Sequence, residues 1–170
     1  MDFTEYDGMI LLARGITGGG QQSVADQVRE WKERGCWRST WEFERAENHV
    51  HARVSLPDRE LVRAEREIAA EFGKALREAY PERRFVISHI PGFGVSFHQL
   101  AEGAPAAGVE AWKKSGVWAR TPEVCGVCGR ARAFRVLPTP DAEFPFVEWG
   151  VCDGCGSDVM LAQCEVRTLV

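Results

Sequence analysis

The sequence lacks a long apolar run. The residues Met1 to Asp7 are acidic, and the apolar run that follows, 9–13, is only five residues long. A secretory signal has a basic start and a longer apolar segment, and a membrane-spanning helix needs about 20 apolar residues. We therefore expect neither feature, no membrane partner and a cytoplasmic location.

An excess of basic residues is missing as well. Lys and Arg number 21 and Asp and Glu number 25, which gives a net charge of −4, and neither half of the chain is basic. Overall charge therefore gives no support to non-specific nucleic-acid binding. The 45% of hydrophobic and 27% of charged residues are ordinary for a soluble globular protein. A length of 170 residues suits one large domain or two small ones.

The known catalytic signatures are absent. The sequence has no nucleophile elbow, zinc-protease helix, protein-kinase set or zinc-deaminase pair of motifs. The glycine-rich loop Gly18–Gly20 lies between a predicted strand and a predicted helix, but the stretch lacks the Lys and Ser or Thr of a phosphate-binding loop. We interpret it as a flexible connection. A non-catalytic protein is thus the expectation, and an enzyme is an alternative.

Cysteine carries the clearest signal. Two pairs, Cys125 with Cys128 and Cys152 with Cys155, each enclose two residues and are each followed by glycine. This spacing lets both sulfurs face one point from a tight turn, and glycine permits the left-handed backbone that such a turn commonly needs. Four thiolates leave a tetrahedral ion no open position, so we predict one structural Zn²⁺. Disulfides, an iron–sulfur cluster and a redox pair are the alternatives.

Residues 1–100 are predicted to form an α+β sheet domain. The apolar run 9–13 predicts a strand buried on both faces, at the centre of a sheet. Apolar residues at helical spacing predict two helices, and alternating patterns predict further strands. The predicted helices are 24–34 and 58–80, and the predicted strands are 37–43 and 50–56, which form a hairpin, 84–90 and 94–100.

The order strand, helix, strand, strand, helix, strand resembles the ferredoxin-like βαββαβ fold. This resemblance implies an antiparallel sheet with both helices on one face. The small and flexible stretch that follows predicts a linker and a short helix over 101–120.

Residues 121–170 are predicted to form a second domain. Two cysteine pairs flank a hairpin of strands 131–137 and 144–152, and a closing strand follows over 158–164. This arrangement resembles a zinc ribbon, which implies that Cys125, Cys128, Cys152 and Cys155 are the ligands. About fifty residues seldom bury enough apolar surface to fold alone, so the ion would replace a core. The other cysteines, Cys36 and Cys164, are expected to be buried, inert thiols.

The predicted function is that of an adaptor or regulator that binds another protein, and a partner inhibitor or immunity protein belongs to this class. The candidate surface is the polar face of the predicted hairpin, with Arg38, Glu42, Glu44, His49, His51 and Arg53. The first alternative is nucleic-acid binding through basic residues near the first cysteine pair, namely Lys113, Lys114, Arg120, Arg130, Arg132 and Arg135.

The second alternative is an enzyme that uses the histidines. His49 and His51 share a face of one predicted strand, and His89 ends another. They could bind a second metal or act as acid and base. In the predicted topology these strands are not adjacent, which places the rings about 10 Å apart.

Overall fold

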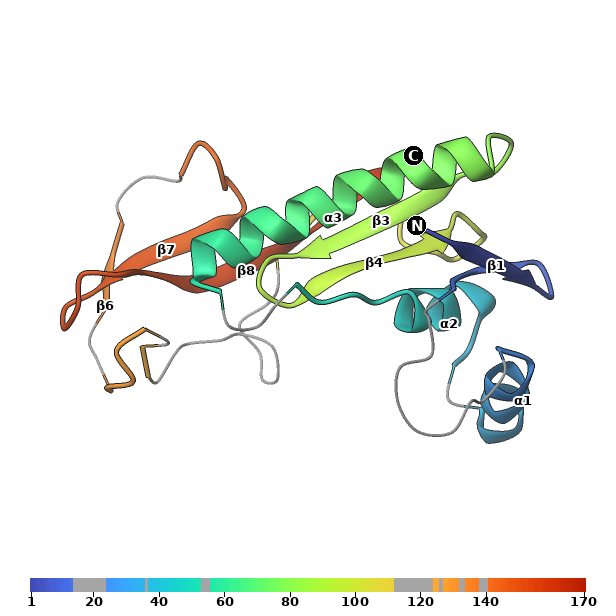
Figure 1. The fold of residues 1–170 in the computed structure, drawn as a ribbon, viewed down its shortest axis with the longest axis horizontal. Coiled ribbons are helices and arrows are strands. Elements are labelled where there is room, and N and C mark those ends of the chain that lie inside the picture. Colours follow the sequence, from blue (N-terminus) through green and yellow to red (C-terminus); the bar gives the residue numbers. More distant parts are fainter. Residues whose placement is uncertain are drawn as a thin grey trace.

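The structure is a computed structural model. It describes residues 1–13, 24–35, 37–52, 56–111, 124–125, 127–131, 134–137 and 141–170. Within these ranges the fold is α+β (Figure 1). The helices are α1 (Val24–Arg34), α2 (Thr40–Glu47) and α3 (Asp58–Ala79). The strands are β1 (Phe3–Tyr6), β2 (Met9–Leu12), β3 (Phe85–Ile90), β4 (Gly94–Gln99), β5 (Gly108–Ala111), β6 (Phe134–Val136), β7 (Val147–Cys152) and β8 (Asp158–Leu169).

The strands form two antiparallel sheets. β1 and β2 make a two-stranded hairpin, and the larger sheet has the order β4-β3-β8-β7-β6, with β5 paired to β8. The 12-residue strand β8 pairs with β7 near its start and with β3 near its end. Strands from the predicted ranges 1–100 and 121–170 therefore belong to one sheet.

Helices α3 and α2 pack against opposite faces of this sheet. Successive side chains of a strand point to opposite faces. On β4, Phe97 contacts Phe72 of α3, with ring centroids 5.1 Å apart, whereas the next residue, His98, contacts Trp41 of α2 at 5.3 Å. Figure 1 shows α3 running along one side of the sheet and α2 on the other side. None of the described helices is long and apolar enough to span a membrane.

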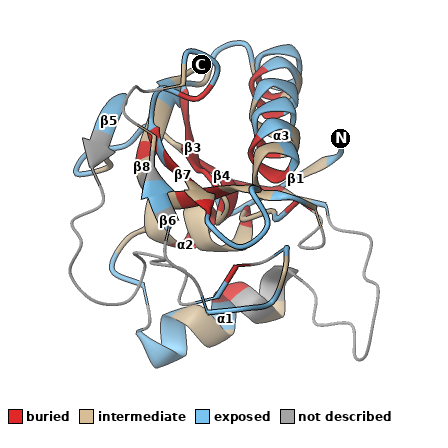
Figure 2. Ribbon diagram, turned by 90° about the vertical axis from the view of Figure 1, so that its left-hand side faces the viewer, coloured by how far each residue is buried: buried red, intermediate tan, exposed pale blue. Residues whose placement is uncertain are grey.

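The main core lies between α3 and the sheet, where buried residues concentrate (Figure 2). Strand β2 contributes to two clusters because its side chains alternate. Ile10 joins the cluster around Phe72, whereas Met9 and Leu11 pack against Phe43 of α2 and Val28 of α1. The prediction that this strand is buried on both faces is confirmed, but the prediction that it lies centrally in a sheet is wrong. Among the described strands it pairs only with β1.

Glu44 of α2 and Asn48, the residue that follows the helix, bridge the edges of β2 and β4, which do not pair directly. The Glu44 carboxylate accepts hydrogen bonds from the backbone N–H groups of Ile10 and Gln99, both at 2.8 Å. Asn48 lies one turn further, on the same helix face. Its amide accepts from the Leu12 N–H at 2.8 Å and donates to the carbonyl of Ile10 at 2.9 Å. It also donates to the Phe97 carbonyl at 3.3 Å.

The predicted hairpin of 37–43 and 50–56 is wrong. Residues 40–47 form helix α2, and Ser39 caps it by accepting a hydrogen bond from the Glu42 N–H. Val50 makes an isolated bridge to Val95, and 53–55 lie outside the described residues. The order of the elements is therefore not ferredoxin-like, and α2 and α3 do not share a face. The helices over 24–34 and 58–80 and the strands over 84–90 and 94–100 are confirmed, with the bounds given above.

Helix α3 also holds the part of the sheet formed by β7 and the start of β8. A buried cluster joins Val62 of this helix to Phe144, Trp149 and Met160. Polar contacts from the same half of α3 surround the cluster. They are the ion pairs of Arg59 with Asp141 and Asp158 and of Arg63 with Glu143, and the hydrogen bonds from Arg66 to the Glu143 carbonyl and from the Met160 N–H to Asp58. The predicted division at 101–120 remains a prediction, and these contacts cross it. Within this range, residues 108–111 form strand β5 of the large sheet, where a linker and a short helix were predicted.

Replacing the bridging amide should weaken the fold. Asn48→Ala removes three hydrogen bonds and leaves buried backbone groups of β2 and β4 without partners, so we expect the free energy of unfolding to fall by about 3 kcal/mol. Glu47→Ala, at the neighbouring half-buried position, is the control and should change it by less than about 0.5 kcal/mol. Urea unfolding followed by circular dichroism measures both. Equal stability of the two variants would contradict the bridging role.

Candidate functional site

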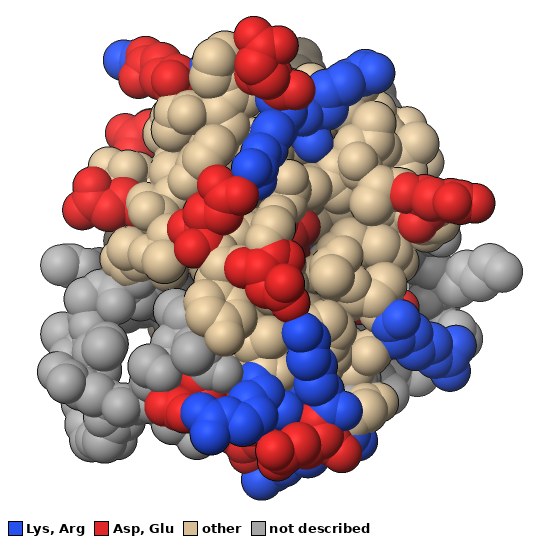
Figure 3. Space-filling model, turned by 90° about the vertical axis from the view of Figure 1, so that its right-hand side faces the viewer, with Lys and Arg blue, Asp and Glu red and all other residues tan. Residues whose placement is uncertain are grey.

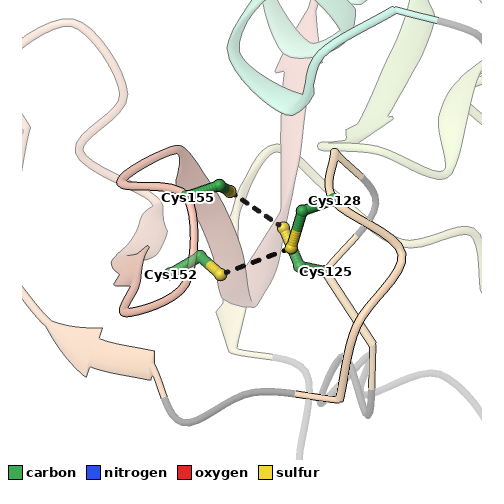
Figure 4. A group of neighbouring side chains, drawn as sticks. All are labelled: Cys125, Cys128, Cys152 and Cys155. Atoms are coloured by element: carbon green, nitrogen blue, oxygen red, sulfur yellow. Dashed lines mark hydrogen bonds between the residues drawn. The ribbon is translucent and has the colours of Figure 1, made fainter.

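The four paired cysteines form one cluster. Their Sγ atoms all lie within 4.8 Å of one another. Cys125 and Cys155 are 3.7 Å apart, and Cys128 and Cys152 are 3.9 Å apart, so each contact joins the two pairs (Figure 4). A tetrahedral ion with metal–sulfur bonds of about 2.3 Å would place its sulfurs about 3.8 Å apart. The cluster can therefore hold one metal ion.

The two cysteine turns have the same backbone hydrogen bonds. In the first, Gly129 donates to the Cys125 carbonyl at 2.8 Å, and the Cys125 N–H donates to the Arg130 carbonyl at 3.1 Å. In the second, Gly156 donates to the Cys152 carbonyl at 2.8 Å, and Cys152 donates to a carbonyl five residues on at 2.9 Å. Both glycines have positive φ, 67° and 73°, which confirms the predicted need for glycine after each pair.

Strand pairing brings the two cysteine turns close together. The first turn precedes β6, and the second connects β7 to β8. Strands β6 and β7 pair antiparallel, with Phe134 opposite Cys152. The predicted strands over 131–137, 144–152 and 158–164 are thus confirmed in position, although β8 runs on to Leu169.

The thiols differ in their tendency to ionise. The Cys128 backbone amide favours the Cys125 thiolate, but burial and two neighbouring sulfurs outweigh it and raise the pKa of Cys125 to about 11. Hydrogen bonds from the side chain and backbone of Ser157 lower the pKa of Cys155 to about 6. A bound cation would favour the thiolate at all four positions, because a coordinating thiol is deprotonated.

A second candidate site is a cavity of about 460 Å³ between α2 and the sheet face that carries His98. We call it the α2 cavity. It brings together three of the predicted partner-binding residues, Arg38, Glu42 and His49. His51 is exposed and stacks on His49, with ring centroids 4.4 Å apart. The other residues that line the cavity include Trp37, Trp41, Arg45, Ser88, Phe93 and Ser96.

Glu44 does not belong to that surface. It was expected on an outward strand face, but it is buried and bridges β2 and β4. Burial raises the pKa of Glu44, and its backbone hydrogen bonds oppose this shift. Arg53 lies outside the described residues.

The histidines are dispersed. His89 faces α3, where its Nε2 lies 3.2 Å from the buried carboxylate of Glu65. His49 lies on the other side of the sheet, with its Nε2 3.1 Å from the Phe93 carbonyl. His98 is 0% exposed, and neither of its ring nitrogens has a hydrogen-bond partner in the described structure. The described residues thus provide no second group of metal ligands.

The candidate nucleic-acid residues are only partly described. Arg130 and Arg135 are exposed, whereas Lys113, Lys114, Arg120 and Arg132 lie outside the described residues. On the face at the α1 and β1 end, Lys and Arg side chains are interspersed with Asp and Glu (Figure 3). That face therefore has no field of one sign.

Sequence reasoning missed the serines and tryptophans of the α2 cavity. Ser88 and Ser96 were included in strands without a role, and Trp37 and Trp41 were assigned to a strand. The motif Ser39-Thr-Trp-Glu42 matches a helix capping box, which could have revealed α2 and the face it presents. Cys36 lies outside the described residues, and Cys164 is half-buried on β8.

Comparisons with protein families, curated proteins and solved structures found no match to this chain.

The native protein should contain one zinc per chain, measured by elemental analysis. Cys152→Ser removes one of four sulfurs and should abolish stoichiometric zinc. Cys164→Ser is the control and should retain it, because Cys164 does not belong to the four-sulfur group. Hydrogen exchange of the metal-free variant tests the predicted domains. Loss of protection in β6 and β7 with full protection in β3 and β4 would support them, and loss throughout would contradict them.

Acid should destabilise the protein in part through His98. Burial and, after it, the charges of Arg45 and Arg167 lower the pKa of His98 to about 4, below the ordinary value of 6.5. The unfolded chain therefore takes up a proton between pH 6.5 and 4 that the folded chain does not, and stability falls over this range by about 3 kcal/mol.

The measurement is urea unfolding at pH 7 and pH 4.5 for the native protein and two variants. The native protein should lose about 2 kcal/mol more than His98→Phe, and the exposed-site control His51→Gln should behave like the native protein. Acid also protonates thiolates and carboxylates, but these groups are the same in all three proteins, so their effect on stability cancels in the comparison. An equal loss in all three proteins would contradict the shifted pKa of His98.

Proposed function

We propose that this protein is a non-catalytic, zinc-binding adaptor that binds another protein through the face around α2. The four-sulfur cluster carries the zinc part of the proposal, because its spacing fits a tetrahedral zinc ion and four protein ligands leave no open position for a substrate. The ion is then structural. The thiols must stay reduced to bind it, so the proposal includes a reducing compartment such as the cytoplasm.

The binding part rests on the residues around the α2 cavity. Trp37 is 40% exposed, and Arg38 is exposed beside it. Tryptophan and arginine are the residue types most enriched among those that dominate protein-binding energy. A concave surface next to these side chains offers a partner both a pocket and a charged rim.

Nucleic-acid binding is the alternative that a specific observation favours. Arg130 is exposed directly after the first cysteine turn, and Arg135 is exposed on β6. Binding of this kind would depend steeply on salt, because each neutralised phosphate releases a counterion. The overall charge of −4 favours the protein partner.

Site-specific photocrosslinking tests the proposal. A benzophenone amino acid at position 37, next to the cavity, should crosslink in cells to one predominant protein. The same group at exposed Glu78 of α3, on the other side of the sheet, is the control and should not. Arg38→Glu should reduce the crosslink at least tenfold, and Arg77→Glu should leave it unchanged. Crosslinked products that disappear on nuclease treatment would show nucleic acid as the partner and contradict the adaptor proposal. Crosslinking at position 37 no stronger than at the control position would also contradict it.

A further inference from the structure

We infer that the α2 cavity receives the C-terminal aromatic residue of a partner protein, with its ring inside the cavity and its carboxylate at Arg38. This inference rests on the proposed function, because it names the part of the partner that the α2 face recognises. A volume of about 460 Å³ lies within the range of ligand-binding pockets, about 300–1,000 Å³, and is large enough for one aromatic residue.

The floor of the cavity has an unmet hydrogen-bonding group. Ser88 on β3 and Ser96 on β4 lie opposite each other in the sheet and are 1% and 6% exposed. The Ser88 hydroxyl has no hydrogen-bond partner in the described structure. Buried hydroxyls are nearly always paired. The Ser88 Oγ exposes less than 1 Å² of surface, so a backbone amide or carboxylate of a partner can pair with it only after the serine side chain rotates toward the cavity.

The walls are aromatic. Trp37 and Trp41 lie on the α2 side, and His49 and Phe93 lie on the other, with their ring centroids 5.0 Å apart. His49 can take this position because residue 94 is glycine, where a Cβ atom would lie 2.5 Å from the His49 Nε2. Aromatic walls favour a flat ring, since stacked and edge-to-face ring pairs are more favourable than burial alone.

Arg38 offers a binding group for a carboxylate at the cavity. Glu42 accepts a hydrogen bond from the Arg38 backbone N–H at 2.6 Å, and Arg45 pairs with Glu165 at 2.8 Å. The Arg38 guanidinium makes no ion pair or hydrogen bond with any described residue. Glu42 keeps its negative charge, because a backbone N–H is neutral. Arg38 is the cation of the cavity without a described partner, and guanidinium binds carboxylate in a two-pronged geometry.

A C-terminal aromatic residue supplies both the ring and the carboxylate while ordering the fewest residues of the partner's chain. Its ring and its carboxylate are joined by three bonds, so both reach one small cavity when a single residue is immobilised. A ring and an acidic side chain from two residues would require a second side chain to be ordered, which costs additional conformational entropy. We therefore assign the partner's terminus, and not an internal acidic segment, to the cavity.

Three acetylated tetrapeptides test the inference: acetyl-Gly-Ser-Gly-Phe with a free carboxylate, the same peptide as its C-terminal amide, and acetyl-Gly-Ser-Gly-Ala with a free carboxylate. Binding is followed by nuclear magnetic resonance at the indole N–H signals of Trp37 and Trp41. The free-acid aromatic peptide should bind with a Kd on the order of 1 mM or below. The amide should bind at least tenfold more weakly, and the alanine peptide should not bind up to 10 mM.

Variants assign the two contacts. Arg38→Gln should weaken the free acid to the level of the amide and leave the amide unchanged. Arg77→Gln, a matched exposed arginine on α3, should change neither. A peptide with an internal Phe-Asp pair and an amidated end that binds as tightly as the free acid would overturn the terminal assignment. Equal binding of acid and amide to the native protein, or no shift of either indole signal, would overturn the inference.

These outcomes are separable from a failure of the proposed function. If the peptides fail but the crosslink at position 37 still captures one protein, the cavity inference is wrong and the adaptor stands. If the free-acid peptide binds as expected but no protein is captured, the cavity recognises aromatic carboxylates and the adaptor proposal is wrong.

Discussion

The edges of β2 and β4 face each other without pairing, and side chains at helix α2 supply the hydrogen-bond partners that these edges lack. A β-strand edge buried without partners is costly, because each unpaired backbone group costs about 1–3 kcal/mol. Glu44 and Asn48 meet this requirement for β2 and β4 with side-chain groups spaced one helical turn apart. The cost is a carboxylate held in the core, as its raised pKa reflects. The adjoining side of the same helix, with Trp41 and Arg45, lines the α2 cavity. The contacts that fix the N-terminal hairpin to the sheet therefore also fix one wall of the cavity.

Strand β8 connects the cysteine cluster to the rest of the molecule. It begins three residues after Cys155 and runs past the main core, where it pairs with β3. Helix α3 supports both ends, through Val62 near the cysteine end and Phe72 in the main core. A zinc ribbon in isolation depends on its ion for folding because it buries little apolar surface. Here the hairpin of β6 and β7 shares a sheet and helix α3 with a larger core. A bound ion would therefore stabilise mainly the local geometry of the two cysteine turns, and less of the overall fold.

The sequence predicted the cysteine cluster well and the middle of the chain poorly, for physical reasons. The cysteine turns are local, and their spacing and glycines alone determine where the sulfurs point. Helices α1 and α3 have unbroken helical periodicity, and β3 and β4 are apolar and end at Pro-Gly or polar residues. In contrast, 37–43 alternates like a strand, yet the capping residue Ser39 and the contacts of Glu44 and Asn48 with distant strands favour a helix. Tertiary contacts of this kind override the local sequence pattern, and the pattern itself gives no information about them. The shared sheet was missed for the same reason, because β8 pairs with β3 across about 80 residues.

The same connectivity relates the metal to binding in the function we propose. Glu165, buried on β8, forms the ion pair that holds Arg45 at the edge of the α2 cavity. Glu165 lies seven residues after Asp158, the first residue of β8, which corresponds to about 24 Å along an extended strand. Pairing fixes which face a side chain occupies, because a one-residue slip would turn every side chain to the other face. The β7–β8 pairing shifts register between Glu148 and Trp149, so a metal that fixes the turn before β8 fixes the register only up to this point. Beyond it, pairing with β5 and β3 holds the part of β8 that carries Glu165, and with it the position of Arg45. The cysteine cluster and the α2 cavity are thus connected by one strand, but the register at the cavity end is set by β5 and β3.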